Sequence, residues 1–146
     1  MIIIDYPTPN FRVKDEANKK WLFDSFRKKW VVLTPEEWVR QNFLHYLTQK
    51  LNYPASLIAL EKELEIGAVK RRFDILVYNN NHQPWLMVEC KSMDVELDAN
   101  VLEQIIQYNM GIPVQHLIIT NGVNCFGWEI VADGLVDMAK IPSFPS

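Results

Sequence analysis

Residues 71–91, RRFDILVYNNNHQPWLMVECK, have the pattern of two apolar strands joined by a polar turn. The segments 71–78 and 84–91 are rich in β-branched, aromatic and aliphatic residues, and the three asparagines at 79–81 are typical of a turn. Because segment 84–91 is apolar on both of its faces, we expect it to be a central strand. The sequence therefore predicts a hairpin at the centre of a β-sheet.

The regions on both sides of this hairpin extend the sheet and add two helices. We predict a helix over 35–51, because Thr34 is a good N-cap and Glu37 would complete a capping box. Further strands are predicted over 57–66, 116–120 and 126–131, and a second helix from Asp98 to about residue 110. A strand, a helix and a strand in succession imply a parallel pair. The fold class is therefore α/β or α+β, with a mixed central sheet flanked by helices.

The chain is expected to form one domain, residues 1–146, because its length is typical of a single domain. Residues 1–33 would form an N-terminal β extension, a meander of three short strands. The strands of this meander are predicted at 11–14, 20–23 and 29–33. Residues 34–131 would form the core, and 132–146 a tail that we expect to dock loosely.

The composition is that of an ordinary globular protein. Hydrophobic residues make up 49% and charged residues 23%, which excludes a disordered or low-complexity chain. The sequence contains no apolar run of about 18 residues, so no membrane helix is expected. The start of the chain lacks the pattern of a signal peptide, and its two cysteines form no disulfide framework. A reducing, cytoplasmic location is the resulting expectation.

Charge is distributed unevenly along the chain, although the formal net charge is only −3. Residues 1–72 hold 13 Lys and Arg against 9 Asp and Glu, whereas residues 73–146 hold 2 against 9. The net acidity argues against a general nucleic-acid coat protein. The asymmetry is compatible with a basic edge beside an acidic centre that attracts cations.

The predicted hairpin carries three charged residues that favour a metal site. Because side chains alternate along a strand, Glu89 and Lys91 share one face, Cys90 points to the other, and Asp74 can lie beside Glu89. Two carboxylates suit Mg²⁺ or Mn²⁺, and the backbone carbonyl of Cys90 can supply another oxygen. Lys91 would then assist an attacking water or offset phosphate charge. The alternative is a polar sheet face with an ordinary Glu–Lys pair.

The two predicted helices carry further candidates. Glu36 projects into the apolar stripe of the first helix, so it is a candidate site residue, whereas Glu37 is interpreted mainly as a cap. Both acids would also complement the helix dipole, which is the alternative reading. On the second helix Gln104 and Tyr108 lie four residues apart, on one face, where they could reach a phosphate or a site water. Partial burial explains this last pair equally well.

These segments together are similar to a known family. TPEEWVRQ, RRFDILVY, VECK and QIIQY closely resemble the N-terminal nuclease domain of type I restriction enzyme R subunits, which belongs to the PD-(D/E)xK nuclease superfamily. The resemblance extends over about residues 23–122. It implies an αβββαβ core, which agrees with the predicted element order. It also implies metal ligation by Asp74 and Glu89, and a catalytic role for Lys91.

The same resemblance implies roles for residues of the two helices, and this sequence differs from the family in one respect, the motor. It implies that Glu36 is the first-helix acid, in E-x-x-V-R spacing, and that Gln104 and Tyr108 match a Q-x-x-x-Y element. R subunits continue into a helicase-like motor, whereas this sequence contains no Gly-rich phosphate loop of the G-x-x-x-x-G-K-S/T kind. We therefore expect no ATP-driven translocation by this chain.

Basic residues suggest where DNA would bind. Lys70, Arg71 and Arg72 directly precede Asp74, so they are the preferred candidates for phosphate contacts. A second basic group lies in the N-terminal extension and consists of Lys19, Lys20, Arg27, Lys28 and Lys29, interleaved with Trp21 and Trp30. Protection of exposed sheet edges explains this second group as well as phosphate contacts do.

The sequence leads to two functional hypotheses. The first is a divalent-metal-dependent DNA endonuclease domain that hydrolyses phosphodiester bonds. The alternative is a nuclease-fold DNA-binding or assembly module with little or no activity alone, which partners other restriction-modification subunits. One site per chain means that cutting both strands of DNA would need a homodimer or two successive events. We also expect that either predicted carboxylate ligand can be removed without loss of the fold.

Overall fold

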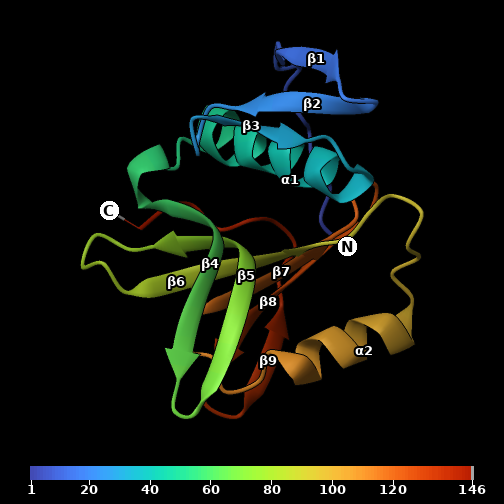
Figure 1. The fold of residues 1–146 in the computed structure, drawn as a ribbon. Helices are drawn as coiled ribbons and strands as arrows, with labels where there is room; N and C mark the ends of the chain where they lie inside the picture. Colours follow the sequence, from blue (N-terminus) through green and yellow to red (C-terminus); the bar gives the residue numbers. More distant parts are fainter. Residues whose placement is uncertain (146) are drawn as a thin grey trace.

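The computed structural model describes residues 1–145 and contains two β-sheets and two α-helices (Figure 1). The N-terminal meander consists of β1 (Val13–Glu16), β2 (Lys19–Asp24) and β3 (Lys29–Val32). The large sheet consists of β4 (Ile58–Ile66), β5 (Val69–Tyr78), β6 (Pro84–Cys90), β7 (His116–Thr120), β8 (Cys125–Val131) and β9 (Gly134–Asp137). Its strand order follows the chain, and only β6 and β7 are parallel. The predicted fold class is confirmed.

The first helix forms where the sequence predicts it. Helix α1 (Pro35–His45) continues through a π-helical stretch, Tyr46–Lys50, and Thr34 Oγ1 accepts a hydrogen bond from Glu37 N at 3.0 Å. The reciprocal half of the capping box is absent, because the N–H of Thr34 donates to Val32 O instead. The interpretation of Glu37 as mainly a cap is therefore wrong, and its carboxylate makes other contacts.

The two helices cover opposite faces of the large sheet (Figure 1). Helix α1 packs on one face through a core that includes Phe43, Leu44 and Val88. Helix α2 (Ala99–Tyr108), capped by Asp98, packs on the other face in a second core around Met87. A central sheet between two apolar layers explains why β6 and β7 are apolar on both sides.

Strands β4 and β5 exchange faces at one point along their length. Leu60 and Ile75 are paired and pack in the α1 core, whereas Leu64 and Phe73, on the far side of Glu61, pack in the α2 core. Glu61 has a left-handed backbone with φ of 50°, which is uncommon outside glycine. This irregularity lies beside Asp74, whose side chain therefore does not follow simple alternation along the strand.

The C-terminal region is packed against the core. Strand β9 pairs with β8, Ile141 is only 4% exposed, and Tyr53 Oη donates a hydrogen bond to Pro142 O at 2.6 Å. The prediction that residues after Gly134 dock loosely is wrong for 134–145. Apolar side chains such as Ile141 have enough burial to hold the segment in place.

Candidate catalytic site

The structure brings Asp74, in the middle of β5, together with Glu89 and Lys91, at the end of the adjacent strand β6. Ile75 of β5 pairs with Val88 of β6, so Asp74 and Glu89 follow at neighbouring positions. Asp74 Oδ2 accepts a hydrogen bond from Cys90 N at 2.8 Å, and Lys91 Nζ lies 3.2 Å from Glu89 Oε1. The hairpin thus forms the predicted grouping, while the roles of these residues stay predictions.

Carboxylates crowd this position, and their pKa values reflect it. Burial raises the pKa of Glu89 to about 7, and the nearby charge of Asp74 adds to the rise, against the opposing effect of Lys91. Glu36, near the start of α1, also has a raised pKa, first because of burial and then because of Asp74. Glu36 therefore lies near the site, although its side chain is about half exposed.

Arg40 of α1 is the residue that sequence reasoning missed. Its guanidinium is buried and lies 3.2 Å from Asp74 Oδ1, 2.9 Å from Glu37 Oε1 and 3.3 Å from Glu61 Oε1. A buried arginine among carboxylates is charge-compensated, and it fixes the position of each partner. The sequence does contain a pattern that indicates this role, because Arg40 directly follows the core residue Val39 and lies one helical turn after Glu36.

The ion pairs of Arg40 continue into the meander. Arg27, in the turn after β2, lies 2.8 Å from Glu37 Oε1 and 3.4 Å from Glu61 Oε2, and it also pairs with the fully buried Asp24. Burial works to raise the pKa of Asp24, but hydrogen bonds from Arg27 hold it below its usual range. We call Asp24, Arg27, Glu37, Arg40 and Glu61 the arginine cluster. It fastens the meander to α1 and to β4.

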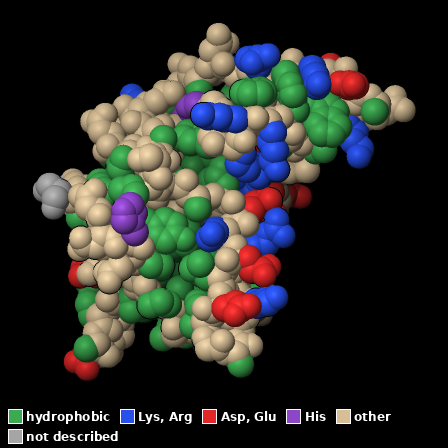
Figure 2. Space-filling model, turned by 60° about the vertical axis from the view of Figure 1, so that its left-hand side comes forward, with side chains coloured by type: hydrophobic (Ala, Val, Ile, Leu, Met, Phe, Trp, Pro, Cys, Tyr) green, Lys and Arg blue, Asp and Glu red, His purple; other side chains and the backbone are tan. Residues whose placement is uncertain are grey.

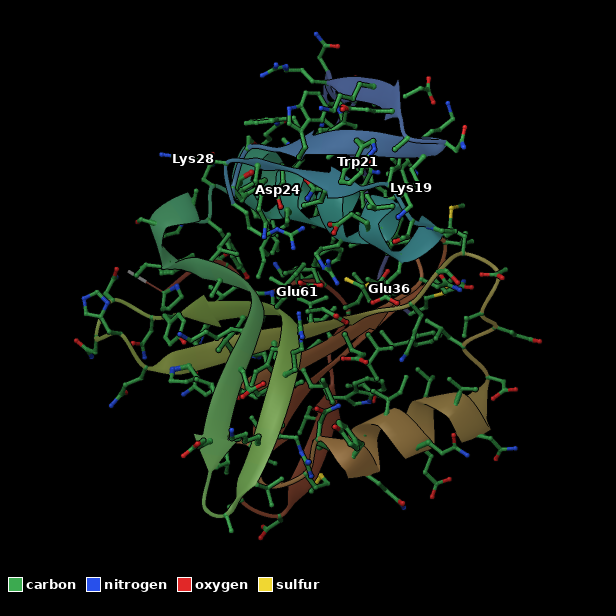
Figure 3. All side chains as sticks on the ribbon, in the orientation of Figure 1. Lys19, Trp21, Asp24, Lys28, Glu36 and Glu61 are labelled. Carbon is green, nitrogen blue, oxygen red and sulfur yellow. The ribbon has the colours of Figure 1, made fainter. Side chains whose placement is uncertain are left out.

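A groove of about 470 Å³ opens between the meander and the start of α1. Its lining includes Trp21, Lys29 and Trp30 on the meander side and Glu36 and Glu61 on the opposite side. In Figure 3, Trp21 lies on the meander while Glu36 and Glu61 lie beneath it. Glu36 also lies near Asp74, so the groove and the candidate site have this residue in common.

Cys90 contributes to the site only through its backbone. Its side chain is 1% exposed in the α1 core, and burial raises the pKa of its thiol well above the usual value, so it is not a nucleophile. Among residues 1–145, no group of three or more His, Cys, Asp or Glu side chains is arranged to hold a metal ion. A metal here would depend on two carboxylates together with backbone oxygen and water.

The pair predicted on the second helix is not brought to the acids. Gln104 and Tyr108 are exposed on α2, and the Tyr108 ring lies 4.5 Å from the Arg71 guanidinium. Within the described chain, neither side chain hydrogen-bonds to Asp74 or Glu89. The proposed Q-x-x-x-Y role stays a prediction, and the contact with Arg71 is a sufficient structural reason for the tyrosine.

The preferred basic run, Lys70 to Arg72, is partly neutralised by the neighbouring strand. Arg72 pairs with Glu61 at 2.9 Å and Lys70 lies 3.9 Å from Glu63, with both basic side chains well exposed. Their role in DNA contacts stays a prediction. Each has less free charge than the sequence alone indicates.

The comparisons with known proteins identify the family. Over residues 1–145, the structure has no helix long and apolar enough to cross a membrane. A search among curated proteins gives no match. A family model described as "Type I restriction enzyme R protein N terminus (HSDR_N)" matches residues 35–145, which include α1, the large sheet and every candidate site residue. The chain therefore belongs to the family of type I restriction enzyme R protein N termini.

Proposed function

We propose that this chain is a DNA endonuclease domain that hydrolyses phosphodiester bonds with Mg²⁺ or Mn²⁺. The observation that carries the proposal is the surplus of acid at the end of β6. Burial and then the nearby charge of Asp74 raise the pKa values of Glu89 and Glu36, and Lys91 is the lysine beside Glu89. Such a surplus in a partly buried site favours a bound cation.

The donor atoms suit a hard divalent cation. Mg²⁺ is commonly held by one or two carboxylates and keeps several of its own waters, so Asp74 and Glu89 are sufficient as side-chain ligands. The carbonyl of Cys90 would supply a further oxygen. Asp74 is already oriented by Arg40 and by the N–H of Cys90, and orientation of this kind is what a ligand needs.

The remaining residues would act on the water and the phosphate. When bound, the ion would make the attacking water more acidic and offset charge on the phosphate. Lys91, beside Glu89, would orient that water or stabilise the developing negative charge. Glu36 faces the groove and would position a water molecule from the opposite side.

One observation favours the alternative, a nuclease-fold DNA-binding or assembly module. Arg40 already pairs with Asp74, so part of the acidic charge is balanced without a metal. In that case the surplus acid would be a remnant, and the chain would act with other subunits of a restriction-modification system.

Plasmid cleavage distinguishes the two proposals. We expect supercoiled DNA to be nicked with Mg²⁺ or Mn²⁺ and not with EDTA, and Glu89→Gln and Lys91→Ala to abolish nicking. Glu65→Gln is the matched control, because Glu65 is an exposed acid on β4. If two copies act together, linear product should appear early, whereas a monomer should accumulate nicked circles first.

Thermal unfolding tests the metal site independently of cleavage. A ligand that binds only the folded state raises the unfolding midpoint by mass action, so millimolar Mn²⁺ should stabilise the wild type. Glu89→Gln should lose this shift, while Lys91→Ala should retain part of it. A wild type that shows neither a shift nor nicking would contradict the endonuclease and leave the assembly module.

A further inference from the structure

The meander is the part of the chain that the family match leaves out. The match covers residues 35–145, whereas β1, β2 and β3 lie before it. Residues 12–29 carry seven Lys and Arg against three Asp and Glu, in a chain with a net charge of −3. Figure 2 shows Lys and Arg side chains gathered on the upper part of the molecule, around hydrophobic side chains.

Aromatic rings hold part of this positive charge in place. The Arg12 guanidinium lies 4.8 Å from the Phe23 ring centre and 5.3 Å from that of Trp30, and Lys14 Nζ lies 4.5 Å from the Trp30 ring centre. Phe23 and Trp30 pack edge to face across β2 and β3. Aromatic faces position a cation without neutralising it, and Arg12 has no carboxylate partner among residues 1–145. Lys14, in contrast, also forms an ion pair with Glu16 at 2.9 Å.

Three further lysines extend this charge along the meander. Lys19, Lys28 and Lys29 are exposed, and within the described residues none of them forms an ion pair. Figure 3 shows Lys19 and Lys28 at opposite ends of the meander, with Trp21 between them. Strand β2 has six residues, so the charges span on the order of 20 Å, the length of several phosphate groups.

The sheet-edge explanation accounts for Lys14 on β1 and Lys29 on β3, which are edge strands, but not for Lys19 and Arg12. Lys19 belongs to β2, the central strand of the meander, and Arg12 lies over the ring of Phe23, on the face of the sheet. Edge protection concerns charges on strands that have an open side. A cationic face with free charge fits phosphate groups better.

We propose that this cationic surface of the meander, which includes Arg12, Lys19 and Lys29, binds the sugar–phosphate backbone of DNA. The groove lined by Trp21, Lys29 and Glu36 would then hold the bound strand between the meander and Glu36, which lies near Asp74. The inference deepens the proposed nuclease function and rests on it for the choice of DNA. The meander supplies the affinity that an acidic chain otherwise lacks.

DNA binding measured by fluorescence anisotropy in EDTA tests this face without cleavage. The variant is Lys19→Gln/Lys29→Gln, and the matched control is Lys50→Gln/Lys140→Gln, which removes the same charge from exposed lysines outside the meander. At low salt we expect the meander variant to bind labelled duplex at least tenfold more weakly. The slope of log affinity against log salt should fall by about two, since each phosphate contact contributes about 0.9. The control should stay within twofold of wild type.

Further arms of the experiment separate the possible explanations. The variant Lys19→Arg/Lys29→Arg keeps both charges, so it should bind as the wild type does. A single-stranded probe should show the same ranking of variants. Equal unfolding midpoints of the variants and the wild type would exclude misfolding. Equal losses in both double variants, or no binding by wild type, would overturn the inference. If the meander variant still binds and cleaves DNA as the wild type does, this inference is overturned while the nuclease proposal stands. Meander-dependent binding without metal-dependent nicking would instead overturn the nuclease proposal.

Discussion

The carboxylates of the arginine cluster and those of the candidate site are neighbours, since Arg40 contacts both groups. Their negative charge is balanced in different ways. In the arginine cluster, Arg27 and Arg40 face the acids directly, and the pKa values of Asp24 and Glu61 are held below their usual range despite burial. In the candidate site, the pKa of Glu89 is raised to about 7. The first group is compensated by two guanidinium groups, whereas in the second Asp74 contacts Arg40 and Glu89 has only the ammonium of Lys91.

This difference distinguishes charge that is balanced within the protein from charge that a bound cation could balance. A matched cluster of buried ions has no need of a ligand, and its energetic role is to fix neighbouring elements relative to one another. Surplus carboxylates raise the free energy of the metal-free protein, and a cation would relieve that cost. Arg40 contacts Glu37 and Asp74, so it belongs to both groups and links them.

The largest effect is expected from removing that link. Arg40→Ala would leave Glu37 and Asp74 without their buried partner, and such losses typically cost about 3–5 kcal/mol. For a domain of this size, that corresponds to a fall of roughly 10 °C in the unfolding midpoint. Arg72→Ala is the control, since its ion pair with Glu61 is exposed and should contribute less than about 1 kcal/mol. Equal effects of the two variants would remove the distinction between the groups.

An intermediate effect should appear in the pH dependence of stability. A carboxyl group with a raised pKa binds its proton more tightly in the folded chain, so Glu89 favours folding below about pH 4.5. That contribution to the free energy of unfolding is lost as pH rises to about 7. It amounts to about 3 kcal/mol at most, since each unit of pKa difference corresponds to about 1.4 kcal/mol. Above pH 7 Glu89→Gln should be more stable than wild type, and the difference should vanish near pH 4. Denaturant unfolding at several pH values measures it, and a constant difference would contradict the raised pKa.

The smallest effect on stability is expected at Glu36. Its side chain is about half exposed, and its ion pair with Arg40 spans 3.6 Å, so Glu36→Gln should change the free energy of unfolding by less than about 0.5 kcal/mol. If Glu36 positions water in the site, nicking should nevertheless fall at least tenfold while DNA affinity is unchanged. Unaltered nicking would assign Glu36 to the helix dipole alone.

The sequence was sufficient for the parts of the fold that rest on local patterns. The hairpin 71–91, the stripe of α1 and the parallel pair of β6 and β7 are all as predicted, because alternation and capping are local properties. The face exchange at Glu61 could not be predicted, since it depends on a left-handed backbone at a residue that rarely adopts one. The packing of Ile141 was missed because it depends on distant partners.

For the candidate site, the predicted hairpin placed Asp74 beside Glu89 and Lys91, but it did not predict what holds them there. Arg40 was not singled out, and Arg27 was counted in the basic group of the N-terminal extension. The carboxylates that they bind come from four different elements, β2, β4, β5 and α1. We expected that either Asp74 or Glu89 could be removed without loss of the fold. The structure gives the two residues different surroundings. Asp74 is bound by Arg40 and by the N–H of Cys90, whereas Glu89 has Lys91 beside it.

The hydrogen bond from the Cys90 amide to Asp74 has a spectroscopic consequence. An amide proton that points at a carboxylate oxygen resonates according to the electron density on that oxygen, and here the N···O distance is 2.8 Å. In a ¹⁵N-labelled sample, the Cys90 cross-peak would therefore move when a diamagnetic cation such as Mg²⁺ draws density from Asp74. Asp74 thus has a reporter in the backbone of the next strand, and a titration that follows the Cys90 resonance would measure cation binding at this carboxylate without a label on any side chain.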